Sequence, residues 1–395
     1  MKKIIYAMWF AAGVLLVFLA MLLVKNQARA ALSWAEGTAA VSMQKPEDTP
    51  AEVQAGQEDA QADDADDIAE AVSSAEEMEA SAVSSAENPV EPEPEVVTIT
   101  VSAAGDCTLG RDEGNDYSMS FNKRFEEHSG DPGWFLREVQ SAFGTDDLTI
   151  INFEGTLTTE TSRADKTFAF KGDPSYVSVL TEGSVEACNL ANNHSFDYGK
   201  QSYEDTKKYI EEAGIVSFGY DRSQVIDVKG IKVGLVGTYE LERGIGCKEI
   251  MLEQIQWVKD NGAQLIICSF HWGDEGYYHP NDIQIELARA AIDAGANLVI
   301  GHHPHLLQDA DVYNGTHILY SLGNFCFGGN KNPKDKDTLI FQQTFTFVDG
   351  ELQKDDDVKF IPCRLSSTTE YNNYQPVIVD GEAAERVLGK VLTNQ

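Results

Sequence analysis

A short stretch near residue 300 concentrates side chains that can bind metal ions or transfer protons. Gly301-His302-His303-Pro304-His305 follows an apolar run and holds three of the chain's eight histidines. Histidine is the commonest metal ligand and titrates near neutral pH, so this pattern favours a metal or acid–base site. A polar surface loop is the alternative interpretation of the same residues.

Polar residues also follow four other strand-like segments, and each has an ordinary explanation when taken alone, as a turn, cap or core residue. Together they offer carboxylate, amide and imidazole ligands, a mixed set that suits Mn, Fe or Zn. We therefore predict a site for one or two divalent ions; two ions about 3.5–4 Å apart would need a bridging carboxylate. The residues concerned are Asp106, Asn152, Glu154, Asn192, Asn193, His194 and His271.

These clusters need strands to position them. Apolar, β-branched runs predict strands at residues 96–101, 148–153, 185–190, 232–236, 265–270, 298–300, 318–322 and 339–347. Helical periodicity is clearest at residues 203–213, 249–259 and 283–294, each followed by a glycine that can end a helix. The alternation predicts an α/β or layered αββα domain. Ligands bind at the carboxyl ends of strands in such sheets, so the polar clusters should share one crevice.

The N-terminus has the features of a membrane segment. Residues 4–24 carry no charge and follow Lys2 and Lys3, and a spanning helix needs about 20 apolar residues. The charge rule places the bulk of the chain outside the cytoplasm. We expect residues 1–30 to be a membrane anchor; Ala28-Arg29-Ala30 leaves a cleaved signal peptide, and hence secretion, as the alternative.

Charge is distributed unevenly along the chain, whose formal net charge is -34. Residues 36–95 hold 18 acidic side chains and a single lysine, whereas residues 96–395 hold 25 basic against 46 acidic side chains, or -21. The acidic Ala/Glu/Ser/Pro composition of residues 31–95 predicts a disordered linker, with a folded domain at 96–395. Such an acidic domain argues against a nucleic-acid partner. The six dispersed cysteines are expected to be buried free thiols.

The order of the motifs resembles that of the capsule biosynthesis protein CapA family. The resemblance covers residues 97 to 365 and rests on six motifs: Gly105-Asp106-Cys107-Thr108-Leu109-Gly110-Arg111, Asn152-Phe153-Glu154-Gly155, Leu190-Ala191-Asn192-Asn193-His194, His271-Trp272-Gly273, Gly301-His302-His303-Pro304-His305 and Ser321-Leu322-Gly323-Asn324-Phe325. It implies a four-layered αββα sandwich like that of calcineurin-type metallophosphoesterases, and a role with poly-γ-glutamate.

The same resemblance implies roles for individual residues. The implied metal ligands are Asp106, Glu154, Asn193, His271, His303 and His305, and His194 resembles the acid that protonates a leaving group. His302 is expected in a supporting or surface position. The metallophosphoesterase pattern begins Asp-x-His, but Thr108 stands where that histidine should be, and Glu154 replaces the usual bridging aspartate. These departures predict a weakened first metal site.

Substrate contacts are predicted for Arg111, Asn152, Lys171 and Asn324. Arg111 could grip a carboxylate or phosphate through two hydrogen bonds, and Lys171 ends a basic segment with Arg163 and Lys166. Solvated surface charge is the alternative for each basic residue.

The sequence thus predicts a membrane-anchored extracytoplasmic protein that acts in synthesis, export or attachment of poly-γ-glutamate or a related anionic polymer, with membrane capsule-synthesis proteins as further partners. It leaves catalysis open. The chain could be a metal-dependent hydrolase of this kind, a non-catalytic polymer-binding or assembly module, or a secreted phosphoesterase.

Overall fold

The computed structural model describes residues 93–354 and 357–392. The predicted membrane segment and all of the predicted linker except residues 93–95 lie outside these ranges. Within the described residues, no helix has the length and apolar character needed to cross a membrane.

The larger sheet has nine strands, and its central strand leads to the polar residues of interest. β1 (Val96–Thr108) runs parallel to β3 and β14 and antiparallel to β15. The other strands are β3 (Leu148–Phe153), β6 (Ala187–Asn189), β7 (Val216–Phe218), β14 (Asn324–Phe327), β15 (Asp337–Val348), β16 (Glu351–Leu352), β17 (Asp357–Arg364) and β18 (Val377–Ile378). Along the sheet they follow the order β18-β17-β15-β1-β3-β6-β7, with β14 beside β1 and β16 beside β15.

A second sheet has six strands in the order β12-β13-β11-β10-β9-β8. Their bounds are β8 (Gln224–Val228), β9 (Ile231–Tyr239), β10 (Leu265–His271), β11 (Leu298–His302), β12 (Ala310–Tyr313) and β13 (Thr316–Leu319). β9, β10 and β11 are parallel, and the register aligns Tyr239, His271 and His302 at one edge. A small third sheet joins β2 (Arg111–Asp112), β5 (Phe170–Gly172) and β4 (Thr156–Leu157).

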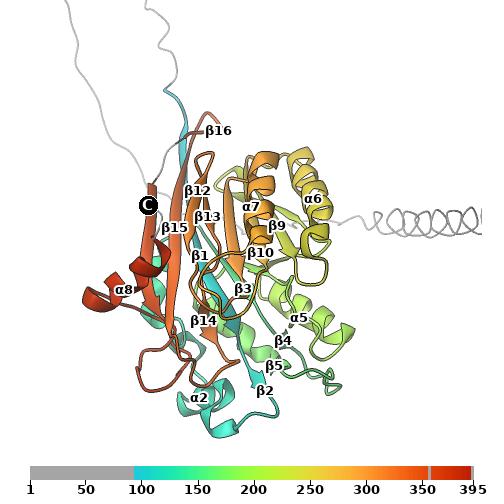
Figure 1. Cartoon of the computed structure of the whole chain (residues 1–395), viewed down its shortest axis with the longest axis vertical. Helices are drawn as coiled ribbons and strands as arrows, with labels where there is room; N and C mark the ends of the chain where they lie inside the picture. The colour runs from blue at the N-terminus through green and yellow to red at the C-terminus, as the bar shows by residue number, and fades with distance from the viewer. Residues whose placement is uncertain (1–92, 355–356, 393–395) are drawn as a thin grey trace, which may run out of the picture. The chain divides into compact units, whose positions relative to one another are not determined.

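The helices pack on the sheets through apolar side chains, and Figure 1 shows α6 and α7 side by side next to β9 and β10. Their bounds are α2 (Phe121–Glu127), α3 (Gln140–Phe143), α4 (Ser178–Glu182), α5 (Lys200–Glu212), α6 (Lys248–Asp260), α7 (Asp282–Ala294) and α8 (Gly381–Val391). α7 begins with a capping box between Asn281 and Gln284 and ends at Gly295, whose φ of 116° suits glycine. The three helices predicted from periodicity are confirmed.

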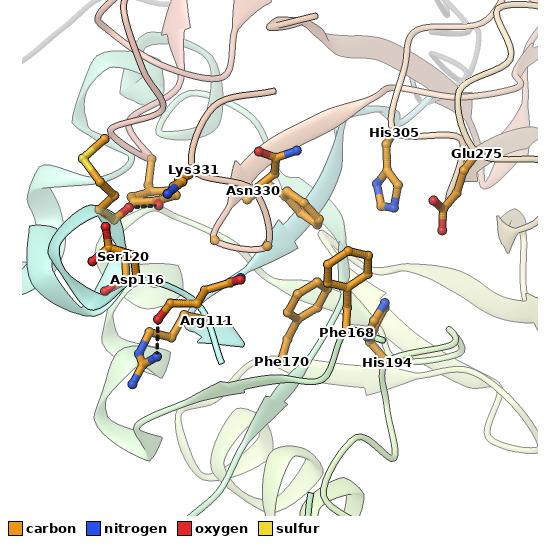
Figure 2. Close-up of a pocket in the computed structure, with 16 residues that line it drawn as sticks. Arg111, Asp116, Ser120, Phe168, Phe170, His194, Glu275, His305, Asn330 and Lys331 are labelled. Atoms are coloured by element: carbon orange, nitrogen blue, oxygen red, sulfur yellow. Dashed lines mark hydrogen bonds between the residues drawn. The ribbon is translucent and has the colours of Figure 1, made fainter. Parts of the chain in front are cut away.

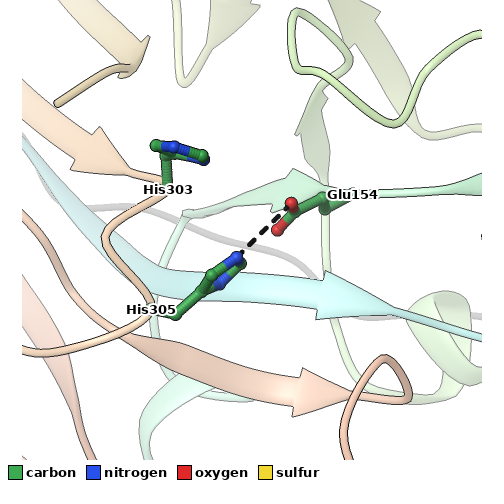
Figure 3. Close-up of side chains that lie close together, drawn as sticks. All are labelled: Glu154, His303 and His305. Carbon is green, nitrogen blue, oxygen red and sulfur yellow. Dashed lines mark ion pairs between the residues drawn. The ribbon is translucent and has the colours of Figure 1, made fainter. Parts of the chain in front are cut away.

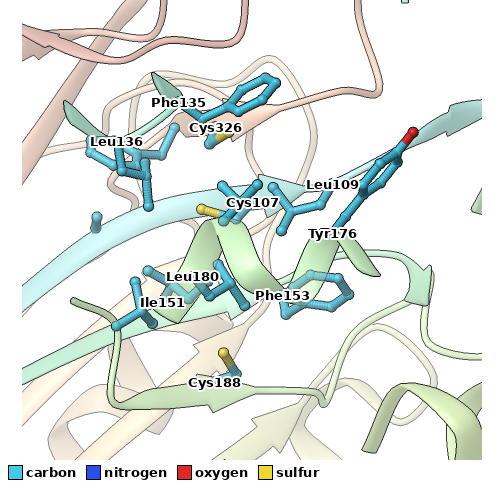
Figure 4. Packing of buried hydrophobic residues seen from close by; sticks show 14 of the residues in the cluster. Cys107, Leu109, Phe135, Leu136, Ile151, Phe153, Tyr176, Leu180, Cys188 and Cys326 are labelled. Atoms are coloured by element: carbon cyan, nitrogen blue, oxygen red, sulfur yellow. The ribbon is translucent and has the colours of Figure 1, made fainter. Parts of the chain in front are cut away.

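Three hydrophobic clusters hold these elements together. One joins β1 and β3 of the large sheet to β9, β10 and β11 of the second sheet. Another packs α6 and α7 against the second sheet. The third, shown in part in Figure 4, packs α2 to α5 against the large sheet and includes Cys107, Cys188 and Cys326. All six cysteines are buried and unpaired, as predicted, and the mixed α/β class with several sheets is confirmed.

Candidate metal centre

Three predicted site residues lie side by side at the ends of adjacent strands. Asp106 of β1 is in register with Asn152 of β3 and with Asn324 of β14. Asn152 Nδ2 donates a hydrogen bond to Asp106 Oδ1 at 2.9 Å. The backbones of β1 and of the turn before β14 approach each other closely beside Asp106, because a Cβ on Gly105 would lie 1.9 Å from the carbonyl oxygen of Gly323. The motif glycine is therefore required by packing.

Glu154, which follows β3, is the most unusual group of the site. Its side chain is fully buried, yet neither carboxylate oxygen has a hydrogen-bond partner among the described residues. Its Oε1 instead faces three imidazole nitrogens, the Nε2 atoms of His194 at 3.7 Å, His271 at 3.9 Å and His305 at 3.8 Å. Burial raises the pKa of Glu154 well above its ordinary value. A buried carboxylate left in this state points to a missing cationic partner.

His303 and His305 complete a group of three candidate ligands with Glu154. One ligand atom from each of the three lies within 4.8 Å of the others, and Figure 3 shows both rings beside the carboxylate. His303 and His305 have φ angles of 97° and 58°, a region that residues other than glycine seldom adopt. This strained turn after β11 brings both rings to one side, and strain of this kind is common at functional sites.

The first predicted ligand, Asp106, lies beside this group but is already hydrogen-bonded by the protein. Its Oδ2 accepts from the His303 backbone N–H at 3.3 Å and lies 3.4 Å from His305 Nδ1. Burial disfavours the charged carboxylate, but the neighbouring imidazoles of His305 and His302 outweigh burial and lower its pKa. Burial likewise opposes protonation of His305, yet Glu154 and Asp106 raise its pKa to about 10.

His302 is buried, not exposed. Its ring lies with Nδ1 3.6 Å from Asp106 Oδ1, and neither ring nitrogen has a hydrogen-bond partner among the described residues. The surface position allowed for His302 is therefore wrong, because β11 is buried along its whole length and hydrophobic clusters cover both of its faces.

The loop after β6 places Asn193 beside His271 and His194 beside Glu154. Asn193 Oδ1 lies 2.9 Å from His271 Nε2, and His271 Nδ1 lies 3.2 Å from Asn152 Nδ2. His194 Nδ1 lies 2.7 Å from Asp197 Oδ2, whose other oxygen binds Lys166 at 2.7 Å. This orientation leaves His194 Nε2 directed to Glu154. Burial lowers the pKa of His194 despite Asp197.

A cavity of about 310 Å³ opens beside these residues. Figure 2 shows His194, His305 and Glu275 at one end and Arg111 and Lys331 at the other. Phe170 stacks on His194 with ring centroids 4.3 Å apart. A cavity of this size and mixed lining is typical of a small-ligand site.

Of the four predicted substrate contacts, only Arg111 lines this cavity. Asn152 lies behind Asp106, and Asn324 Oδ1 lies 2.9 Å from His305 Nδ1. Lys171 lies outside that cavity and binds Glu113 at 2.6 Å. The other residues of the predicted basic segment are also paired, Arg163 with Asp112 and Lys166 with Asp197, each at 2.7 Å.

Sequence reasoning missed one positioning group and several cavity residues. Asp197 holds His194, and the predicted residue Asn192 fixes that loop because its Oδ1 accepts the His194 N–H at 3.0 Å. The order Asn-Asn-His-Ser-Phe-Asp was a usable signal for Asp197. Glu275 lines the cavity from the loop after β10 and had no signal in the sequence.

The residues present fit a divalent cation. The buried, unpartnered Glu154 carboxylate and the free Nδ1 of His303 supply the oxygen and nitrogen donors that such ions prefer. Asn193 and His271 lie next to these donors and are joined to each other.

Comparison with known proteins identifies the family of this chain. A family model described as bacterial capsule synthesis protein PGA_cap matches residues 100–329. The PGA biosynthesis protein CapA of Bacillus subtilis (strain 168) is 33% identical over 251 residues, covering 58% of this chain and 63% of that protein. The capsule biosynthesis protein CapA of Bacillus anthracis is 32% identical over 249 residues, covering 53% of this chain and 60% of that protein. The matched region spans less than two thirds of either relative.

Proposed function

This chain belongs to the bacterial capsule synthesis family PGA_cap, and on that premise we propose that it acts in synthesis, export or attachment of poly-γ-glutamate or a related anionic surface polymer. The names of its Bacillus relatives, which concern PGA and capsule biosynthesis, support the polymer class. We propose that the work is done at a divalent metal site built around Glu154. The membrane capsule-synthesis machinery is its proposed partner.

The observation that carries this proposal is the buried Glu154 carboxylate, which faces His303 and His305 without a hydrogen bond. Glu154, His303 and His305 would hold the ion, and Asn193, His271 and Asp106 would complete or support its surroundings. A divalent ion bound there would act as a Lewis acid toward an oxygen of the substrate. Manganese, iron and zinc all suit this donor set.

His194 is the proposed proton donor. Its Nδ1 is held by Asp197, so Nε2 is the nitrogen free to act on a group bound in the cavity. Lys166 forms an ion pair with the other oxygen of Asp197. Arg111 lines the far end of the cavity and is the proposed contact for an anionic portion of the substrate.

The test is turnover of a generic phosphodiester and of a γ-glutamyl polymer by the metal-supplemented full chain. We expect His194→Ala to lower turnover by about 100-fold or more while the metal content stays unchanged. His128→Ala, which changes a histidine stacked on Trp134 away from the cavity, is the matched control. Equal turnover in His194→Ala and wild type would contradict the assignment of His194.

A non-catalytic polymer-binding or assembly role is the second candidate, and Thr108 favours it. The hydroxyl of Thr108 donates to the Glu154 carbonyl oxygen at 2.5 Å, so this position offers no ligand comparable to a histidine. Absence of hydrolysis with every metal, together with loss of polymer binding in Arg111→Ala, would favour this role. A secreted phosphoesterase would need more phosphate-binding groups, and Arg111 is the one arginine among the described residues that line the cavity.

The arrangement in the cell is part of the same proposal. We propose that residues 1–30 anchor the chain in the cell membrane, that residues 31–95 are a linker, and that residues 96–395 form an extracytoplasmic domain. The charge pattern of the N-terminus supports this orientation. We also propose the four-layered αββα metallophosphoesterase-like arrangement, which the hydrophobic cluster shared by the two large sheets supports.

A further inference from the structure

A second cavity, of about 530 Å³, collects positive charge in an otherwise acidic domain. Five basic side chains line it, drawn from three separate parts of the fold: the loop between β14 and β15, the end of β17, and α8. They are Lys334, Lys336, Arg364, Arg386 and Lys390. Residues 96–395 hold 25 basic against 46 acidic side chains, so the local balance runs opposite to that of the domain.

Ion pairing within the cavity leaves an excess of positive charge. Its two acidic residues are both engaged: Asp337 binds Arg386 at 2.8 and 2.9 Å, and Asp335 binds Lys390 at 2.6 Å. The remaining three cations form no ion pair with any described residue, since Lys336 and Arg364 donate to neutral oxygens only. Five cations against two carboxylates leave a net charge of +3.

This pairing contrasts with that of the basic segment singled out in the sequence. Arg163, Lys166 and Lys171 are each neutralised by a carboxylate of the domain itself, at 2.6–2.7 Å. Attraction of a polyanion therefore cannot depend on those three residues alone. The excess charge lies elsewhere, on the loop after β14 and on the residues that surround it.

The same two loops contribute residues to the basic cavity and to the metal-site cavity. Lys331 lines the cavity that contains His194 and His305, and Lys334, three residues later, lines the basic one. The loop after β10 also contributes to both, with Glu275 in the first and Tyr278 in the second. Figure 2 shows Lys331 and Arg111 at the end of the metal-site cavity away from His305.

We infer that the basic cavity is a docking surface for a polymer with repeated carboxylates, and that the loop through Lys331 leads this polymer to the metal site. The inference rests on the proposed function. A single exposed cation–carboxylate pair is worth roughly 0–1 kcal/mol, so one carboxylate would bind weakly here. A polymer engages several cations at once, and linked contacts raise the overall affinity.

The test is binding of fluorescently labelled poly-γ-glutamate of defined length to the detergent-solubilised full chain, followed by anisotropy. The variant is Lys334→Gln/Lys336→Gln/Arg364→Gln, which removes the unpaired cations and leaves both aspartate pairs intact. The matched control, Lys200→Gln/Lys232→Gln/Arg289→Gln, removes two lysines and one arginine that are exposed and form no ion pair with other described residues. Thermal unfolding of each variant checks that it is folded.

We expect the variant to bind about tenfold more weakly than wild type and the control to bind about as wild type does. The variant should also lose less affinity than wild type between about 0.05 M and about 0.5 M salt, since it forms fewer screened pairs. Equal weakening in variant and control would overturn the docking surface while leaving the proposed function standing. No polymer binding by folded wild-type protein would overturn both.

Discussion

Thr108 stands where the metallophosphoesterase pattern has a metal-binding histidine, and its side chain is committed to the backbone. Its hydroxyl is buried and donates to the carbonyl oxygen of Glu154. Thr108 thereby fixes the backbone of the residue whose carboxylate anchors the candidate metal centre. The observed role of Thr108 is therefore to hold the backbone at Glu154.

The substitution Thr108→Val tests this role. It leaves a buried carbonyl oxygen without its partner, so we expect the free energy of unfolding to fall by about 1–3 kcal/mol. Metal content, measured by elemental analysis, should not change, because Thr108 is not a ligand. Thr108→Ser keeps the hydroxyl and is the control. Loss of metal at unchanged stability would show that Thr108 contacts the ion.

Individual site residues differ in how far the sequence could predict them. His303 and His305 follow a buried strand at a spacing that marks them as a pair, and the structure brings them together with Glu154. The pairing of Lys171 with Glu113 could not be predicted, because the two residues lie far apart in sequence and meet only through β2 and β5. His302 is buried because both faces of β11 are covered, and the apolar run before it was the available signal of a buried strand.

At the scale of elements, the meeting of β1 with the turn before β14 sets the position of Asp106. The Asp106 N–H donates to the Gly323 carbonyl oxygen at 2.9 Å, and Gly105 has no room for a side chain. The two motif glycines therefore have a structural purpose that is distinct from chemistry.

We expect Gly105→Ala to lower the free energy of unfolding by about 1–3 kcal/mol, because its Cβ would overlap the Gly323 carbonyl. The matched control is Gly389→Ala in α8, where a Cβ meets no atom within 4 Å. That control should be as stable as wild type or gain up to about 1 kcal/mol, because alanine favours helix. Chemical denaturation measures both; equal stability of the two variants would contradict the close approach of β1 and β14.

Two carboxyl groups lie just before the N-terminal ends of β3 and β6, at the end of these strands away from the candidate metal centre. They should make the free energy of unfolding depend on pH. Burial raises the pKa of Glu186 to about 7 and that of Asp146 to about 6, although both accept hydrogen bonds from Thr149. Burial favours the neutral form of Glu186 in the folded state. The contribution of this raised pKa to the free energy of unfolding is fully present below the ordinary pKa of 4.5. It is lost as the pH rises through about 7.

Glu186→Gln keeps the acceptor for the Thr149 N–H but cannot ionise. We expect the stability of wild type relative to this variant to fall between about pH 4.5 and pH 7, by at most about 3 kcal/mol. Denaturation series across this pH range measure the difference. A difference that stays constant, or that grows with pH, would contradict the raised pKa.

Long, periodic elements were predictable and short or charged ones were not. The predicted strand at 148–153 has the observed bounds, and α7 differs from its prediction by one residue. β17 was missed although Asp357 and Lys359 alternate with Val358 and Phe360, a pattern that is itself typical of a strand with one exposed face. β2, β4 and β5 were missed because two or three residues carry no detectable period, although together they position Arg111 and Phe170.

At the scale of the whole molecule, the negative charge of the domain opposes the binding of an anionic polymer. The sequence alone shows that residues 96–395 carry a net charge of -21, which repels a polyanion at long range. The fold gathers Lys334, Arg364 and Arg386 into one basic cavity. No sequence pattern predicts this cavity, because the three residues lie on separate elements.

The central claim is a metal ion held by Glu154, His303 and His305. Asp106 is already hydrogen-bonded within the protein, and Thr108 is not a ligand. We therefore expect one ion per chain rather than two. Glu154→Gln should lose this ion. Glu240→Gln, which changes another buried carboxylate that binds the Gly273 N–H, should keep it.

The most direct test is elemental analysis of the purified full chain after supplementation with manganese, iron or zinc and removal of excess metal. We expect one ion per chain in wild type and Glu240→Gln, and a large loss in folded Glu154→Gln. No bound metal in wild type, or an equal content in Glu154→Gln, would contradict it.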